Sequence, residues 1–341
     1  MTDSVTAGVR LLSPEEIAVR AGEPLPFLRL PEAGLFAERE MRLRQLAAGH
    51  AMRDYLLFIA ELARGQHELL KQELTLALPS VAQIEDAANA GLPLLPAADW
   101  PRDAVWRDSL RSLLQTLATR LPAGPARETA LQLAAQGDAH LELQADRLLS
   151  GVMLGLDLGT APLIAAGLQL HWTRLLTQVQ KAHGNDKLTP KIPPFGRTDD
   201  PTLCPCCGSR PTSSITRLGA EASGYRYLHC SLCAAEWHYV RIKCTHCQGT
   251  KGIQYEGLQA LTATEPSAAG AVQAECCEAC GHYLKIVHME KDNQVDPAAD
   301  DLASLTLDLL VSESGLARHG VNLMLLFGDP DPDPEPDPGG G

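Results

Sequence analysis

The chain has 341 residues, and 45% of them are apolar, which is enough to bury a sizeable hydrophobic core. Its formal net charge of −13 argues against a protein whose main partner is a nucleic-acid phosphate backbone. No stretch reaches the roughly 18 apolar residues of a membrane-spanning helix, and the first residues lack the basic and apolar regions of a secretory signal. We therefore expect a cytoplasmic protein without stable membrane insertion.

The first 184 residues are predicted to form a helical bundle domain. The stretch Ser13–Glu16 has the pattern of a helix-capping box, and Gly22 follows as a stop signal. Further along, apolar residues recur at the spacing of the buried face of a helix. These stripes run over Tyr55–Leu62, Trp106–Leu117 and Ile164–Val179. Because this region has its own apolar stripes and no cysteine, we expect it to fold by itself.

Residues 185–203 contain four prolines and are predicted to form a semi-extended linker after the helical domain. The sequence contains no phosphate-binding glycine loop, no nucleophile elbow and no metalloprotease helix motif. The histidines of the helical region are scattered and show no paired-carboxylate pattern. We therefore expect a protein that is not an enzyme.

All ten cysteines lie between Cys204 and Cys280. Without an export signal, the reducing compartment favours thiolates that hold a metal over a disulfide framework. Each C-x-x-C turn can present two sulfurs to one ion, so four turns complete two tetrahedral sites. Such closed sites leave no open position for substrate, which favours structural or electron-transfer roles. The predicted ligands are Cys204, Cys207, Cys230, Cys233, Cys244, Cys247, Cys277 and Cys280.

The order of the cysteine pairs along the chain leaves two arrangements open. Sequential pairing gives two successive modules, residues 204–243 and 244–291, whereas interleaved pairing gives one cross-braced unit. We favour sequential pairing because each module is predicted to contain a β-hairpin between its two pairs and a further strand after them. The predicted strands are Ser213–Leu218, Tyr225–Cys230 and Glu236–Ile242 in the first module, and Gly252–Leu258, Ala271–Cys276 and His282–Met289 in the second.

Two cysteines, Cys206 and Cys276, are left over beside members of the pairs. Because the C-x-x-C spacing is the usual one for a metal knuckle, we interpret both as small hydrophobic residues. Among the histidines of this region, His246 is the best substitute ligand, since it lies inside the third C-x-x-C turn. Residues 204–291 carry eight basic and seven acidic side chains without a basic stripe, so nucleic-acid binding is a minor hypothesis.

Residues 292–328 are predicted to form a C-terminal helical and apolar segment. Asp300 is expected to cap a short helix, and the apolar stretch Val321–Phe327 is expected to pack back on the body of the protein. Residues 329–341 alternate acidic residues with prolines and end in glycines, which predicts a disordered acidic tail. The apolar positions of the short helix are Leu302, Leu305 and Leu309.

Motifs across residues 204–322 go beyond metal-ligand spacing. They begin with the rubredoxin-type knuckle C-P-C-C-G, and they continue through Arg226–Cys247, Cys277–Asp292, Ala299–Leu310 and Gly315–Asn322. Together they resemble the FdhE family of formate dehydrogenase accessory proteins. The two spare cysteines and the acidic tail are additions to the family's pattern.

The resemblance implies an α-helical N-terminal domain, two small β-rich rubredoxin-like (zinc-ribbon-like) metal modules and a short C-terminal helix. It implies a cytoplasmic, client-specific chaperone that respiratory formate dehydrogenase, a molybdenum- or tungsten-containing enzyme, needs for its activity. The expected partner is the catalytic subunit of that enzyme before export.

The resemblance also implies two metal ions per chain. The resemblance favours iron. Zinc is the alternative, because sulfur ligation suits both metals. The alternative function is a rubredoxin-like redox protein that passes electrons to the same client. The sequence leaves open whether two chains form a homodimer.

Overall fold

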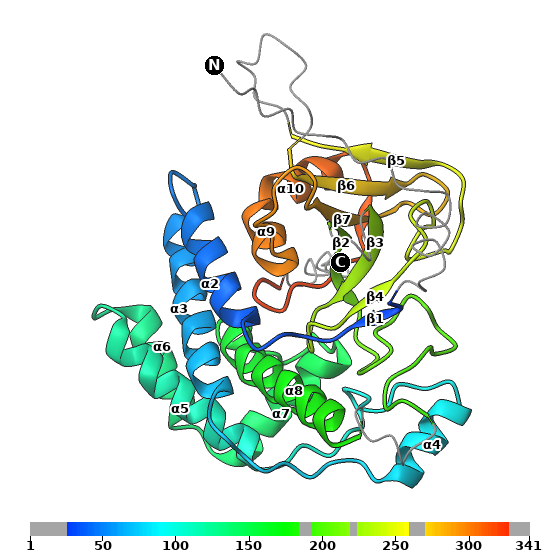
Figure 1. Ribbon diagram of the computed structural model, residues 1–341. Coiled ribbons are helices and arrows are strands. Elements are labelled where there is room, and N and C mark those ends of the chain that lie inside the picture. Colours follow the sequence, from blue (N-terminus) through cyan, green and yellow to red (C-terminus); the bar gives the residue numbers. More distant parts are fainter. Residues whose placement is uncertain (1–25, 184–191, 219–223, 259–269, 327–341) are drawn as a thin grey trace, which may run out of the picture.

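The structure is a computed structural model that describes residues 26–183, 192–218, 224–258 and 270–326 (Figure 1). It confirms a helical N-terminal part, which is followed by a β-rich part and a short helical segment. The helix start predicted at Ser13 and the predicted acidic tail, residues 329–341, lie outside the described residues. Within the described ranges, no helix combines the length and the apolar character that crossing a bilayer requires.

The N-terminal helices are α2 (Leu35–Leu46), α3 (Arg53–Leu70), α4 (Val81–Asn89), α5 (Val105–Arg120), α6 (Pro125–Ala134), α7 (Asp138–Ser150) and α8 (Ala161–His183). The predicted apolar stripes lie in α3, α5 and α8, and α5 ends just before Pro122. Helix α8 contacts α3, α5 and α7. It is buried around most of its circumference, as is typical of a central helix.

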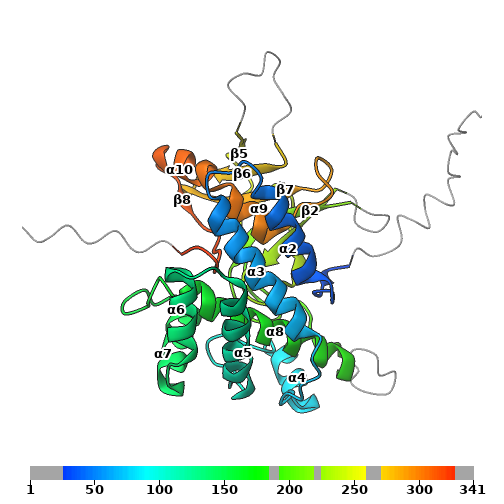
Figure 2. The same ribbon diagram turned by 90° about the vertical axis from the view of Figure 1, so that its left-hand side faces the viewer.

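Both cysteine modules contribute to one mixed sheet (Figure 2). Its strands are β1 (Leu28–Arg29), β2 (Pro211–Arg217), β3 (Tyr225–Cys230), β4 (Glu236–His238), β5 (Ile253–Glu256), β6 (Val272–Cys277), β7 (His282–His288) and β8 (Ala317–Arg318). The order across the sheet is β1-β4-β3-β2-β7-β6-β5, and β8 pairs with β7. Strands β2 and β7 run parallel with Ser214 opposite Ile286, so the two modules are joined edge to edge.

The predicted strands agree with the observed ones except at Glu236–Ile242, where β4 is shorter and ends at His238. The next residue, Tyr239, is buried, and its hydroxyl donates to the carbonyl oxygen of Cys244. The exposed residues that follow it form the turn that leads into the second module. Strand β1, which the sequence analysis did not predict, pairs with β4 and places Leu28 opposite Trp237.

The C-terminal segment forms α9 (Pro297–Ala303) and α10 (Leu305–Glu313), and the predicted cap at Asp300 is wrong. Asp296 caps α9 instead, because its carboxylate accepts the N–H groups of Ala298 and Ala299 and Pro297 occupies the first turn. Asp300 lies inside the helix and binds Arg42 of α2 through two hydrogen bonds. A charged partner in the N-terminal part therefore fixes the position of Asp300.

The apolar positions predicted for the C-terminal helix are only partly correct. Leu302 is buried, but Leu309 is 57% exposed, and Leu307 and Val311 face the interior instead. The predicted packing of the apolar stretch after α10 is confirmed as far as Leu326, because Leu323 and Met324 are buried and the Tyr55 hydroxyl donates to the Met324 carbonyl oxygen.

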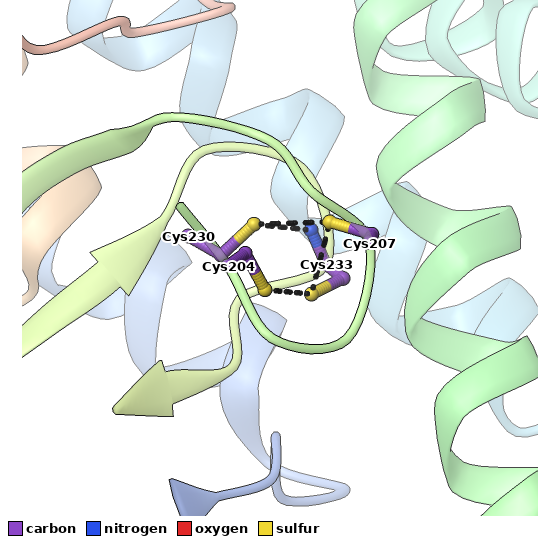
Figure 3. Close-up of side chains that lie close together, drawn as sticks. All are labelled: Cys204, Cys207, Cys230 and Cys233. Carbon is purple, nitrogen blue, oxygen red and sulfur yellow. Dashed lines mark hydrogen bonds between the residues drawn. The ribbon is translucent and has the colours of Figure 1, made fainter. Parts of the chain in front are cut away.

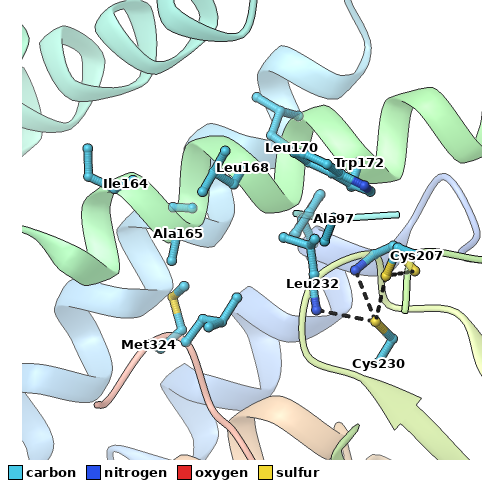
Figure 4. Packing of buried hydrophobic residues seen from close by; sticks show 14 of the residues in the cluster. Ala97, Ile164, Ala165, Leu168, Leu170, Trp172, Cys207, Cys230, Leu232 and Met324 are labelled. Atoms are coloured by element: carbon cyan, nitrogen blue, oxygen red, sulfur yellow. Dashed lines mark hydrogen bonds between the residues drawn. The ribbon is translucent and has the colours of Figure 1, made fainter. Parts of the chain in front are cut away.

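One hydrophobic core extends from the N-terminal helices into the first cysteine module. Figure 4 shows Leu170 and Trp172 of α8 on one side of this core and Leu232 with Cys207 on the other. Phe195, from the proline-rich segment predicted as a linker, is buried in the same core. The first module therefore packs directly against the N-terminal helices.

Candidate metal centres

The structure gathers the eight predicted ligands into two groups of four. Cys204, Cys207, Cys230 and Cys233 form the first cluster, and Cys244, Cys247, Cys277 and Cys280 form the second cluster. In each cluster the ligand atoms all lie within 4.8 Å of one another. This is the sequential arrangement, which the sequence analysis favoured over the interleaved one.

All four C-x-x-C turns are built by the same backbone pattern. The residue four positions after the first cysteine has a positive φ in every turn: 74° at Gly208, 57° at Ala234, 60° at Gln248 and 69° at Gly281. In the first turn, the N–H of Gly208 donates to the Cys204 carbonyl oxygen, and equivalent bonds close the third and fourth turns. The left-handed residue folds the chain back, so that both sulfurs of a turn point the same way.

The first cluster has the dimensions of a closed four-sulfur metal site (Figure 3). The Sγ atoms of Cys207 and Cys230 are 3.4 Å apart, and those of Cys204 and Cys233 are 3.5 Å apart. A tetrahedral ion with metal–sulfur bonds of about 2.3 Å has sulfurs separated by about 3.8 Å, whereas a disulfide bond measures about 2.05 Å. The N–H groups of Leu232 and Cys233 point at the Cys230 sulfur, each at 3.4 Å. Donors in these positions favour a thiolate.

Burial makes a cation necessary if all four thiols of the first cluster are to ionise. Burial is the largest cause that raises the pKa of Cys204, Cys230 and Cys233 well above the usual thiol value. Hydrogen bonds among the thiols raise the pKa of Cys233 further, and they act in both directions on Cys204 and Cys230. Burial also opposes ionisation of Cys207, but hydrogen bonds from the other three thiols lower its pKa well below the usual value. Without a cation, most of the four thiols thus stay protonated. A divalent ion would let all of them ionise. The donor set therefore fits a metal ion.

The helical part holds the first cluster through its backbone. The N–H of Leu95 donates to the Cys206 carbonyl oxygen at 3.0 Å, and the N–H of Ala97 donates to the Cys207 carbonyl oxygen at 2.9 Å. From α8, the amide of Gln169 donates to the Ser231 carbonyl oxygen at 2.8 Å. Both turns of the first cluster are therefore fixed by residues far away in the sequence.

The second cluster has the same donor set in a more open setting. The Sγ atoms of Cys244 and Cys280 are 3.7 Å apart, and those of Cys247 and Cys277 are 3.8 Å apart. The N–H of Gly249 donates to Cys247 and lowers the pKa of this thiol, whereas burial raises the pKa of Cys280 to about 12. Cys247 is exposed and Cys280 is half-buried, while every ligand of the first cluster is buried.

The two spare cysteines lie in different environments. Cys276 packs with Tyr283, Leu307 and Val311, and burial raises its pKa to about 11. Cys206 is buried beside the first cluster; burial opposes its ionisation, but hydrogen bonds with Cys204 and Cys233 lower its pKa to about 7. The surroundings of Cys276 agree with its interpretation as a small hydrophobic residue, whereas Cys206 lies next to two predicted ligands.

A group of histidines lies beside the second cluster. The rings of His246 and His282 are stacked with centroids 3.7 Å apart, and His319 stands edge-on to His246 at 5.3 Å. Sequence spacing indicated His246, and the position of His282 close after Cys280 was an available signal. His319 could not have been found this way, because only the pairing of β8 with β7 brings it here.

Comparisons with known proteins cover most of the chain. Residues 25–188 match the family model of the FdhE N-terminal domain, residues 203–241 that of the FdhE central domain, and residues 242–325 that of the FdhE C-terminal domain. The FdhE homologue of Pseudomonas aeruginosa is 37% identical over 316 residues, which are 92% of this chain and 97% of that protein. The FdhE protein of Salmonella dublin is 34% identical over 326 residues, 94% of this chain and 99% of the other.

A solved structure also resembles the whole fold. The crystal structure of the FdhE protein from Pseudomonas aeruginosa superposes with a TM-score of 0.72 at 36% identity. The match covers 89% of this chain and all of the other. The agreement extends over the helical part and both modules, so it concerns the complete architecture.

Proposed function

This chain belongs to the FdhE family, and on that basis we propose that it is an accessory protein of a formate dehydrogenase. The observation that carries the proposal is the family match over the helical part and both modules, together with the two four-cysteine clusters. In finer terms, the chain acts as a client-specific chaperone in the cytoplasm. It contacts the catalytic subunit, and the enzyme is inactive without it.

The two clusters each hold one metal ion in this proposal, with iron favoured and zinc as the alternative. The ligands are Cys204, Cys207, Cys230 and Cys233 for one ion and Cys244, Cys247, Cys277 and Cys280 for the other. Four thiolates fill the coordination sphere of a tetrahedral ion, so neither ion would offer a position to a substrate. The chain therefore has no turnover of its own and works by binding.

The turn that precedes the second cluster is the surface that we assign to the client. Val240 and Ile242 are 53% and 60% exposed, although both are apolar, and the exposed Arg241 lies between them. Two exposed apolar side chains beside a cation in one short turn offer another protein a small contact surface. The variant Val240→Ser/Ile242→Ser should weaken client binding while both clusters keep their metal.

The alternative function is a rubredoxin-like redox protein, which one observation favours. Cys247 of the second cluster is exposed, so an iron ion there would lie close to the surface and to a docked partner. Replacing iron by zinc separates the two functions, because zinc has no redox chemistry. A chaperone keeps its effect on the client when it is loaded with zinc, whereas an electron carrier loses it.

The decisive experiment joins genetics with binding. In a strain that lacks this gene, formate oxidation should be lost while the client polypeptide persists, and the wild-type gene should restore it. Co-purification should recover the catalytic subunit with the wild type but not with Cys230→Ser/Cys233→Ser, which should bind one ion instead of two. The buried spare Cys276→Ser is the matched control and should behave as the wild type. Undiminished formate oxidation in the deletion strain would contradict the proposal.

A further inference from the structure

The two clusters differ in their access to solvent. The first cluster lies inside the main hydrophobic core, and the exposed fraction of its four cysteines is 1% or less. In the second cluster, Cys247 is exposed and Cys280 is half-buried. An ion leaves a thiolate site when incoming ligands replace the sulfurs one after another, so the rate depends on access to at least one sulfur. The second cluster offers that access and the first does not.

Two imidazoles lie next to this accessible side. His246 is exposed and His282 is half-buried, and the two rings stack with an interplanar angle of 8°. One ring nitrogen of each histidine and the Cys280 sulfur all lie within 4.8 Å of one another. Imidazole and thiolate are both good ligands for zinc, ferrous iron and cobalt. The three side chains therefore form a second donor group that shares one sulfur with the cluster.

The hydrogen bonding of His282 sets its tautomer. Its Nδ1 lies 2.8 Å from the carbonyl oxygen of Cys280. A carbonyl oxygen can only accept, so Nδ1 carries the hydrogen and Nε2 keeps its lone pair in the neutral ring. Metal-binding histidines commonly have one ring nitrogen fixed in this way by a backbone carbonyl while the other binds the ion. The backbone of the fourth cysteine turn thus prepares His282 to act as a ligand.

We propose that His246 and His282 form, with Cys280, a solvent-facing secondary metal site through which the second cluster takes up and releases its ion. The first cluster keeps its ion throughout. This inference rests on the proposed occupancy of both clusters. During release, the ion exchanges thiolate bonds for imidazole bonds, and each displaced thiolate takes a proton from water, so no oxidation is involved. The stacked rings must tilt apart to reach one ion, and the exposure of His246 leaves room for this movement.

Chelator kinetics on the full-length, zinc-loaded protein test the inference. A colorimetric chelator in excess should remove one ion per chain in a fast phase and the other in a slow phase. In His246→Ala/His282→Ala the fast phase should slow by about tenfold or more, while the slow phase keeps its rate. An unchanged or accelerated fast phase in this variant would overturn the proposal. The single variant His246→Ala keeps the bond between His282 and Cys280, so it tests the imidazole without disturbing the turn.

Two further measurements make the result specific. His238, a half-buried histidine on β4 of the first module, supplies the matched control His238→Ala, which should leave both phases unchanged. Cobalt(II) bound to Cys247→Ser should show the absorption of mixed nitrogen and sulfur ligation, and the added His246→Ala/His282→Ala changes should abolish it. A wild type that binds no metal would refute the proposed occupancy. Two ions released at one common rate would refute the exchange site alone.

Discussion

Arg226 and Glu275 form a buried ion pair that connects the two cysteine modules. The guanidinium Nη1 on β3 lies 3.0 Å from the carboxylate Oε1 on β6, and the side chains are 0% and 3% exposed. The same guanidinium donates to the carbonyl oxygens of Val240 and Lys243, immediately before the second cluster. Burial raises the pKa of Glu275, although Arg226 acts in the opposite direction. One side chain of the first module thus holds the segment that enters the second.

The Arg226–Glu275 pair predicts a strongly non-additive pair of substitutions. Glu275→Met leaves a buried guanidinium without its counter-charge and should lower the free energy of unfolding by about 3–5 kcal/mol. The double variant Arg226→Met/Glu275→Met removes both charges and should cost much less than the sum of the single changes. Urea unfolding of the metal-loaded proteins measures both. Additive losses in the double-mutant cycle would show that the two charges do not interact in the folded state.

The left-handed residues in the cysteine turns predict opposite effects of two small changes in the second module. Gln248 has a φ of 60°, which a side chain disfavours, so Gln248→Gly should stabilise the protein by about 1 kcal/mol. Gly281 occupies the same position in the fourth turn with a φ of 69°, and a methyl group there would meet nothing within 4 Å. Gly281→Ala should therefore destabilise by a similar amount through the backbone alone. Equal signs for the two changes in thermal unfolding would contradict this explanation.

The C-x-x-C spacing, the apolar stripes of α3, α5 and α8, and most strands of the two modules could be predicted because they are local patterns. What the sequence did not reveal depends on contacts between distant segments. Asp300 has the chemistry of a helix cap, but Arg42, which lies 258 positions earlier, binds it inside the helix. The parallel pairing of β2 with β7 leaves no periodic signal in either strand. His319 joins the histidine group only because β8 adds to the sheet.

The apolar stripes of the sequence predict a helical domain that folds by itself, but the core that this part shares with the first module predicts the opposite. We expect that the helical part will not fold natively when the rest of the chain is removed. In the complete protein, α8 packs against Leu232 and Cys207, and Gln169 donates to the Ser231 carbonyl oxygen. A fragment that ends at Asp186 exposes these apolar surfaces to water and loses the hydrogen bond from Gln169 to Ser231. It should keep helical far-ultraviolet circular dichroism but melt without cooperativity and bind a hydrophobic dye. A sharp, reversible melting transition of this fragment would instead establish an independent helical domain.

The last prediction concerns His171, which is 2% exposed within α8. Neither ring nitrogen has a hydrogen-bond partner within the described part of the chain. Burial, assisted by the nearby Arg174, lowers the pKa of His171 from 6.5 to about 4. As the pH falls below 6.5, the unfolded chain therefore binds a proton at this side chain that the folded protein does not yet bind. The folded state loses stability between pH 6.5 and pH 4, and the loss is complete below the lower value.

Replacing this imidazole should remove the loss. His171→Leu keeps an apolar side chain of similar size in the core and should be nearly neutral at pH 8. At pH 4 its free energy of unfolding should exceed that of the wild type by roughly 3 kcal/mol. Protonation of the cluster thiols weakens both proteins equally, so the difference between their urea midpoints isolates the histidine. His140→Leu, at a half-buried position on α7, is the matched control. The difference in free energy of unfolding between wild type and His171→Leu could instead stay constant from pH 8 to pH 4. This result would contradict the prediction, because His171 would then bind its proton as readily in the folded protein as in the unfolded chain.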